Sequence, residues 1–470
     1  MKNKILRALT VVALLSTLNS ELSTVFAQGA LTPPGAPAPT MKSLAQIEPR
    51  TAISAAPFTI AQSGAYYLTT NVFASSNAIV IAANGVSLDL GGWTISSTAP
   101  NATTGGTAIL LVGGLKNVTI QNGFIQGGVT NNGSGVFGGG GFGSGIHYSG
   151  NQPVNVLVTK VLVSGCLLYG INLSQGDSTV VEDCTVRTVG NWGIFASTIR
   201  GSRTVDCGYT AIIGDLVADC HGECVGNSYG ISATVALNCY GSGSPNGAGI
   251  HADTAQNCYG YSTNGTGIYV SSSAQNCYGY SANYSGISLK DDGTLIGCTA
   301  NSSATGITAG NRCTIKDCTA SNNSTNGIVA GQSCRVSGCT ASSNGTGATG
   351  IGISTGIRTT IESCTVNDNQ GDGILAVGDC TVLDNHASHN ALGVATAAGI
   401  HATGAGNRID GNHTRDNVGY GIKSDGGAGA DTIIRNTSGG NSVAQYSPSS
   451  GSTFAPVQTP ATMTNPSANF

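Results

Sequence analysis

Tyrosines recur at one position of a repeated pattern in the middle of the chain. Three Asn-Cys-Tyr-Gly units place Tyr240, Tyr259 and Tyr278 directly after a cysteine, and Tyr261 and Tyr280 follow two residues behind the last two. If the cysteine of each unit points inward, strand alternation turns the next residue outward. Outward rings on a polar surface could stack against sugar rings, but columns of identical aromatics also stabilise a sheet face by themselves. Both a carbohydrate-binding and a structural role therefore stay open.

Ionisable side chains lie on the predicted strand that carries the Gly-Ile pair, or just after it. His251, Asp253, Asp291 and Asp292 are the candidates for catalysis. Asp253 and Asp291 would stand two repeats apart, about 10 Å at the usual strand spacing. That separation is at the far edge of the roughly 6.5–9.5 Å range of an inverting carboxylate pair. Solvated turn residues are the alternative interpretation.

A second polar group is expected near the C-terminal end of the repeats. Aligning Cys364 with Asn385 and Asn412 puts His386 beside His413. Histidine close to carboxylates is a possible acid/base arrangement. Polar residues at surface turns are the commoner explanation.

These residues are positioned by a short repeat. Cys239, Cys258 and Cys277 are 19 residues apart, and Gly-Ile recurs from residue 145 to residue 421. Such a unit is too short for a helix-turn-helix repeat or a propeller blade. It cannot bury its own apolar face, so successive units must stack and share one core. The sequence therefore predicts an all-β, right-handed parallel β-helix, a solenoid of about 16 coils with an N-terminal cap.

The Gly-Ile and Cys columns resemble those of the pectate-lyase-like superfamily of right-handed parallel β-helix repeat proteins. The resemblance covers roughly residues 79–440 and implies a polysaccharide ligand or substrate. If the chain is an enzyme, the resemblance implies a polysaccharide lyase or glycoside hydrolase. The family's catalytic motifs are missing, including Arg-Ile-Lys of polygalacturonases, Arg-x-Pro-x-x-Arg of pectate lyases and Asp-Pro-His-Asp of mannuronan epimerases. No catalytic residue carries over, so whether the chain is an enzyme stays open.

The N-terminus has the features of an export signal. Lys2, Lys4 and Arg7 precede an apolar run at 8–18, and Ala27 ends a small-residue cleavage site. We therefore expect a secreted, periplasmic or cell-surface protein. The predicted divisions are a signal peptide at 1–27, a Pro-rich linker at 28–48, a cap at 49–78, the β-helix at 79–440 and a tail at 441–470.

The low charged fraction and small net charge limit the classes of partner that can be expected. Only 9% of the 470 residues are charged and the formal net charge is −4, which gives no electrostatic reason to expect nucleic acid. Beyond the signal peptide, no apolar run is long enough to span a membrane. We expect a monomer without a cofactor, whose partner is a polysaccharide or cell-surface glycan.

Fifteen cysteines in an exported chain first suggest disulfides. Stacked coils about 4.8 Å apart instead favour a ladder of buried thiols, because a disulfide needs its Cβ atoms closer together. Cys207, Cys220 and Cys224 are expected to lie off the regular pattern and are the best candidates for pairing. The run from Cys220 to Cys224 includes His221 and Glu223 but lacks a second matching ligand pair, so no metal site is predicted.

The function expected from the sequence is binding, and in one version processing, of a polysaccharide along the solenoid face. The alternative is a non-catalytic structural or adhesive surface solenoid. A third interpretation, a periplasmic ligand-binding helper of the kind linked to copper delivery, is weakened by the presence of only three methionines.

Overall fold

The computed structural model describes residues 48–470 except 104–105, 245, 347–348, 427–430 and 460–463. The chain divides into Met1–Pro49, of which only the last two residues are described, and Arg50–Phe470. The predicted signal peptide at 1–27 and the linker at 28–48, apart from its last residue, lie outside the described residues. In the described part of the chain, no helix has the length and apolarity needed to cross a membrane.

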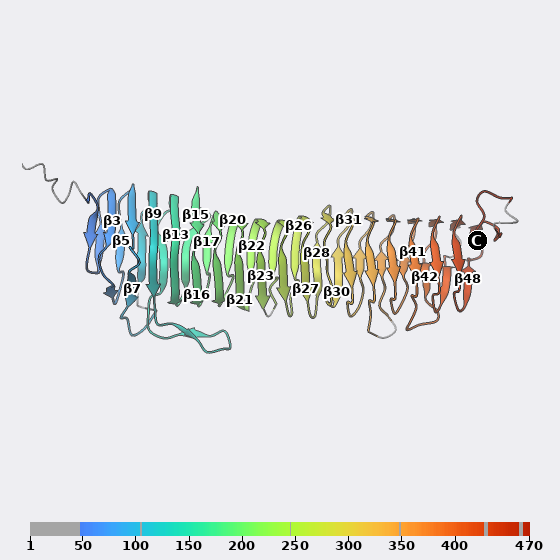
Figure 1. Cartoon of the computed structure of the whole chain (residues 1–470), viewed down its shortest axis with the longest axis horizontal. Helices are drawn as coiled ribbons and strands as arrows, with labels where there is room; N and C mark the ends of the chain where they lie inside the picture. The colour runs from blue at the N-terminus through green and yellow to red at the C-terminus, as the bar shows by residue number, and fades with distance from the viewer. Residues whose placement is uncertain (1–47, 104–105, 245, 347–348, 427–430, 460–463) are drawn as a thin grey trace, which may run out of the picture. The chain divides into compact units, whose positions relative to one another are not determined.

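Residues Arg50–Phe470 form a right-handed parallel β-helix, as predicted (Figure 1). Each coil offers up to three strand positions, so the strands stack into a first, a second and a third column. The first column carries the Gly-Ile pairs and contains 18 strands, which corresponds to about 18 coils rather than 16. These strands are β2 (Phe58–Ile60), β5 (Ile79–Ile81), β8 (Thr107–Val112), β12 (Ser144–Ser149), β14 (Tyr169–Ser174), β17 (Ile194–Ala196), β20 (Ile212–Ala218), β22 (Ile231–Leu237), β24 (Ile250–Gln256), β26 (Ile268–Gln275), β28 (Ser285–Leu289), β30 (Thr305–Ala309), β33 (Ile328–Ala330), β36 (Ile353–Thr355), β39 (Ile374–Ala376), β42 (Ala398–Ala402), β45 (Tyr420–Ser424) and β48 (Ala444–Ser447).

The second column includes the C-terminal halves of β20, β22, β24 and β26, which run through from the first. Its other strands are β1 (Thr51–Ile53), β3 (Gly64–Leu68), β6 (Val86–Asp89), β9 (Lys116–Gln126), β13 (Val154–Cys166), β15 (Thr179–Glu182), β18 (Thr198–Arg200), β29 (Thr294–Ile296), β31 (Thr314–Lys316), β34 (Arg335–Ser337), β37 (Thr360–Glu362), β40 (Thr381–Leu383), β43 (Arg408–Asp410), β46 (Thr432–Ile434) and β49 (Thr453–Phe454).

The third column carries the tyrosines and includes the C-terminal halves of β9 and β13. Its other strands are β4 (Val72–Ala74), β7 (Thr94–Ser97), β16 (Thr185–Val189), β19 (Arg203–Cys207), β21 (His221–Asn227), β23 (Tyr240–Ser244), β25 (Tyr259–Ser262), β27 (Tyr278–Ser281), β32 (Thr319–Ser321), β35 (Thr340–Ser342), β38 (Thr365–Asn367), β41 (His386–Ser388), β44 (His413–Arg415) and β47 (Thr437–Gly439). A short hairpin, β10 (Thr130–Asn131) with β11 (Phe137–Gly138), lies in an excursion from the coils.

The coils extend beyond both predicted limits of the β-helix. Strands β1 to β4 come from the segment expected to be a cap, yet they pair in parallel with the strands of the next coil. At the other end, β48 and β49 belong to the predicted tail and pair with β45 and β46. The repeat motifs fade at both ends. At the N-terminal end, β3 and β4 keep the alternation of buried and more exposed residues that is typical of a strand with one face in the core, whereas the four residues of β48 are all half-buried.

The interior is built from ladders of identical residues. The isoleucines of the Gly-Ile pairs, such as Ile250, Ile268 and Ile287, are fully buried in the first column. All fifteen cysteines are buried thiols rather than disulfides, including Cys207, Cys220 and Cys224. Cys220 occupies the first rung of an unbroken run of eight cysteine positions, followed by Cys239, Cys258, Cys277, Cys298, Cys318, Cys339 and Cys364. The idea that Cys220 lies off the pattern was wrong, because it precedes Cys239 by the same 19 residues.

Backbone conformation and close packing explain why each Asn-Cys-Tyr-Gly unit has an asparagine before the cysteine and a glycine two residues after it. Asn257 has a left-handed backbone, with φ 53°, at the turn before Cys258, and asparagine tolerates this conformation better than most residues. Its side-chain amide donates to Asn238 Oδ1 at 3.1 Å, one coil back. Gly260 faces Gly267 across the interior, and a Cβ added to Gly260 would lie 2.2 Å from the Gly267 carbonyl oxygen. Close approach, rather than an unusual φ, therefore requires these glycines.

Candidate functional site

The tyrosines predicted to share a column do so. Tyr240, Tyr259 and Tyr278 are register partners on β23, β25 and β27. The ring centroids of Tyr240 and Tyr259 are 5.3 Å apart, those of Tyr259 and Tyr278 are 5.0 Å apart, and both pairs are nearly parallel. We call these three residues the tyrosine column.

A second pair stands on the same strands. Tyr261 and Tyr280 are two residues further along β25 and β27, hence on the same side of the sheet, and their rings stack at 5.2 Å. Tyr259 is 39% exposed, the highest value among these five side chains. Within the tyrosine column each ring covers a face of its neighbour, so a ligand meets mainly ring edges and phenol hydroxyls. Tyr278 ends the column because its next partner is Thr299.

A histidine and an arginine continue the tyrosine column toward the N-terminus. His221 stacks on Tyr240 with centroids 4.5 Å apart, and Arg203 is the register partner of His221. His221 Nε2 lies 2.5 Å from Glu223 Oε1, and the Arg203 guanidinium is 3.9 Å from the same oxygen. The sequence analysis missed this group as part of the face. The signal was available, since His221 precedes Tyr240 by the 19-residue period.

Burial, together with neighbouring groups, disfavours the charged form of two phenols of the tyrosine column. Burial raises the pKa of Tyr240, and the Glu223 carboxylate adds to the rise. Burial and the neighbouring tyrosines raise the pKa of Tyr259 in the same direction. Both phenols therefore stay protonated near neutral pH and can donate hydrogen bonds.

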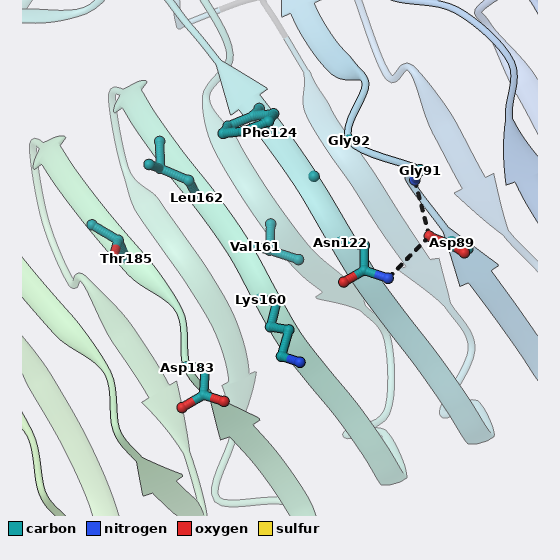
Figure 2. Close-up of a pocket in the computed structure, with 11 residues that line it drawn as sticks. Asp89, Gly91, Gly92, Asn122, Phe124, Lys160, Val161, Leu162, Asp183 and Thr185 are labelled. Carbon is teal, nitrogen blue, oxygen red and sulfur yellow. Dashed lines mark hydrogen bonds between the residues drawn. The ribbon is translucent and has the colours of Figure 1, made fainter.

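The third column is hollowed further toward the N-terminus. Phe124, Leu162 and Thr185 are register partners that lead up to Arg203, and they line a cavity of about 550 Å³. Figure 2 shows these three side chains on neighbouring strands, with Lys160 between Asn122 and Asp183 along the other side. The outward face from Phe124 to Tyr278 is thus one continuous row of eight coil positions.

His251 lies in a different place, on the outward side of the first column. Its ring stacks between Tyr229 at 4.9 Å and Tyr269 at 5.0 Å. All three rings line a cavity of about 420 Å³, which we call the side pocket. Burial lowers the pKa of His251, and the nearby Asp253 only partly offsets this effect. The imidazole is therefore neutral at physiological pH.

The three acidic candidates do not converge with His251 in the side pocket. Asp253 accepts a hydrogen bond from Ser271 of the next coil. Asp291 accepts from the Asn311 backbone amide at 2.9 Å, and Asp292 forms a two-bond pair with Arg312 at 2.6 and 2.7 Å. The Arg312 guanidinium lowers the pKa of Asp292. All three carboxylates are exposed groups that already have partners.

The C-terminal alignment is confirmed, since His386 and His413 are register partners with stacked rings 5.0 Å apart. Another group there was missed. His401 lies between Asp372 and Asp425, at 3.0 and 2.9 Å, and Lys423 Nζ is 2.7 Å from Asp425. These residues come from three coils of unequal length, so spacing alone could not align them. Burial opposes charge on His401, but its two carboxylate partners outweigh burial and raise its pKa.

Metal binding finds no support in the arrangement of ligand types. Within the ranges that the structure describes, no three His, Cys, Asp or Glu side chains are grouped to hold a metal ion. The alternation of side chains along β21 explains why the residues from Cys220 to Cys224 do not converge on one point. The two cysteines point into the core, whereas His221 and Glu223 point outward.

Residues 236–438 match the family model described as the right handed beta helix region. Among solved structures, the chain is similar to the A-module of mannuronan C-5 epimerase AlgE4 from Azotobacter vinelandii, with 16% identity, a TM-score of 0.19 and coverage of 82% of this chain and 88% of that one. A double mutant of the periplasmic alginate epimerase AlgG shows 11% identity, a TM-score of 0.30 and coverage of 78% and 75%. The Dettilon tailspike protein shows 13% identity, a TM-score of 0.20 and coverage of 85% and 60%. A search of curated proteins found no match. At such identities the likeness concerns the fold alone.

Proposed function

We propose that this chain binds a polysaccharide along the outward face of the third column of its right-handed parallel β-helix. The observation that carries the proposal is the unbroken row from Phe124 to Tyr278, whose last five positions are an arginine, a histidine and three tyrosines from successive coils. Seven coil steps of about 4.8 Å make this row roughly 34 Å long. A linear polymer suits a face of that shape better than a small molecule does.

The chemistry of the row favours a hydroxyl-rich ligand. The phenols of Tyr240 and Tyr259 are held protonated, so they offer donors at a regular repeat. The edges of the stacked rings supply apolar contact. The export signal expected at 1–27 would deliver this face to the periplasm, the cell surface or the medium.

Processing of the polymer is a second candidate function, favoured by one observation. His221 and Glu223 form a short hydrogen bond directly beside the tyrosine column, and a histidine oriented by a carboxylate can transfer protons. Asp253, Asp291 and Asp292 remain catalytic candidates only if the bound polymer extends to the turns between the first and second columns, where these residues lie. Their existing partners make this arrangement less favourable than a site at His221.

The test is a binding screen of the purified chain against neutral and acidic polysaccharides by affinity electrophoresis, with product release recorded in parallel. Tyr259→Ala and Tyr278→Ala should each weaken binding about tenfold, the change produced by losing about 1.4 kcal/mol. His413→Ala is the matched control, because it removes a stacked ring from the same column outside the proposed face.

The outcomes separate the alternatives. Equal binding by all three variants, or no binding across the panel, overturns the proposal and favours the structural or adhesive solenoid. Products that disappear in His221→Ala while binding persists support processing. Unfolding curves on each variant distinguish a lost contact from a lost fold.

A further inference from the structure

The side pocket presents aromatic faces that the tyrosine column does not. Tyr269 is the last ring of the Tyr229–His251–Tyr269 stack, because its register partner on the next strand is Ser288. Tyr284 also lines the pocket, is 57% exposed, and stacks on no other ring in the described part of the chain. A ligand in this cavity can therefore contact ring faces.

The polar groups of the side pocket are available for hydrogen bonding. The side chains of Asn246, Thr266 and His251 line it, and none of them has a side-chain hydrogen bond to another described residue. A neutral imidazole offers one donor and one acceptor, a hydroxyl offers both, and an amide offers two donors and an acceptor. Mixed donors and acceptors of this kind match the hydroxyl groups of a sugar.

Charge distinguishes this cavity from the others described above. The hollow in Figure 2 is lined by Asp89, Lys160 and Asp183, and the cavity at His401 is lined by Asp372 and Lys423. The side pocket has no Asp, Glu, Lys or Arg in its lining. An anionic ligand would thus enter without a counter-charge, which is costly in a partly buried site.

We infer that the side pocket binds a single uncharged sugar unit, stacked between Tyr269 and Tyr284 and hydrogen-bonded by Asn246, Thr266 and His251. Its volume of about 420 Å³ lies within the range usual for small-molecule sites. The inference rests on the proposed polysaccharide function and deepens it, since it adds a separate subsite on another column of the same coils.

The test uses saturation-transfer NMR on the full chain with glucose, galactose, mannose and N-acetylglucosamine as neutral probes. Glucuronate, galacturonate and adenosine are the comparison ligands. We expect a response from at least one neutral sugar, at least tenfold weaker affinity in Tyr284→Ala, and near-native affinity in Tyr284→Phe, which keeps the ring. His413→Ala is the control, because it removes a stacked ring that lies outside both the proposed polysaccharide face and the side pocket.

Each outcome bears on one site. No response to any neutral sugar, an equal response to the uronates, or a response to adenosine alone overturns the inference. Loss of polymer binding in Tyr259→Ala with the sugar response intact supports both sites. Intact polymer binding together with a missing sugar response overturns the side pocket alone, whereas the reverse result overturns the proposed polysaccharide face alone.

Discussion

The tyrosine column and the side pocket use the same kinds of side chain on the same coils to different effect. In the column each tyrosine has a tyrosine or histidine at the same position of a neighbouring coil, and the rings cover one another. In the side pocket the stack ends at Tyr269, where the next coil supplies Ser288. Accessibility of an aromatic face in a solenoid thus depends on the residue one coil away. A regular repeat exposes ring edges and hydroxyl groups, whereas an interrupted repeat also exposes a ring face.

The largest effect is expected from the contact that both regions share. Gly267 directly precedes the strand that carries Tyr269, and an added Cβ would lie 2.5 Å from both the Gly286 carbonyl oxygen and the Tyr280 amide nitrogen. Gly267→Val should destabilise the protein by about 3 kcal/mol, the upper end for overpacking, and abolish both binding activities. Denaturant unfolding measures the loss. Gly439→Ala, where an added Cβ meets nothing within 4 Å, should be nearly neutral, and comparable destabilisation there would contradict the close-packing explanation.

One substitution should extend the Tyr229–His251–Tyr269 stack of the side pocket by a further ring. Ser288→Tyr adds a ring opposite Tyr269 in register, so the open face of Tyr269 should be covered. We expect neutral-sugar affinity to fall about tenfold, which corresponds to about 1.4 kcal/mol, while polymer binding to the tyrosine column persists. Calorimetric titration measures both affinities. Unchanged sugar affinity in this variant would show that the ring face is not used.

Acid should affect the side pocket through His251. Burial places the pKa of this imidazole below its usual value of 6.5, so the unfolded chain takes up its proton at a higher pH than the folded one. The contribution of His251 to stability is fully present above pH 6.5 and falls as the pH drops through the lowered pKa. Sugar affinity should be flat above neutrality and fall in the same acidic range. His251→Gln should remove this step, and an identical pH profile in the variant would assign the step to another group.

The smallest expected effect is an extension of the tyrosine column. Thr299 follows Tyr278 in register, so Thr299→Tyr adds one more stacked ring. We expect stabilisation of about 0.5–1 kcal/mol, the usual size of a cross-strand aromatic pair, without any change in the sugar affinity of the side pocket. A shift of the urea midpoint measures it. Destabilisation would mean that the end of the column is already closed by its surroundings.

Much of the fold could be predicted because the spacing of the repeat in the sequence identifies which residues are register partners on successive coils. The spacing of Cys239, Cys258 and Cys277 was enough to place Tyr240, Tyr259 and Tyr278 in one column, and the match of Asn385 with Asn412 was enough to pair His386 with His413. Where coils differ in length, as around His401, spacing no longer aligns residues and the three-coil charge cluster was missed. The side pocket was missed for another reason. Its lining combines residues of β24 and β26 with residues of the loops that precede β22, β24, β26 and β28, and loop conformation has no period.

Cys239, Cys258 and Cys277 of the three Asn-Cys-Tyr-Gly units are 19 residues apart, and the tyrosine and glycine that follow each cysteine are register partners. A slip of one unit during copying of such a gene joins strand to strand and leaves all other coils in register. An in-frame gain or loss of one such unit would therefore lengthen or shorten the tyrosine column by one ring. The length of the tyrosine column would then depend on the number of repeat units, whereas the chemistry at each position depends on the residue within the unit.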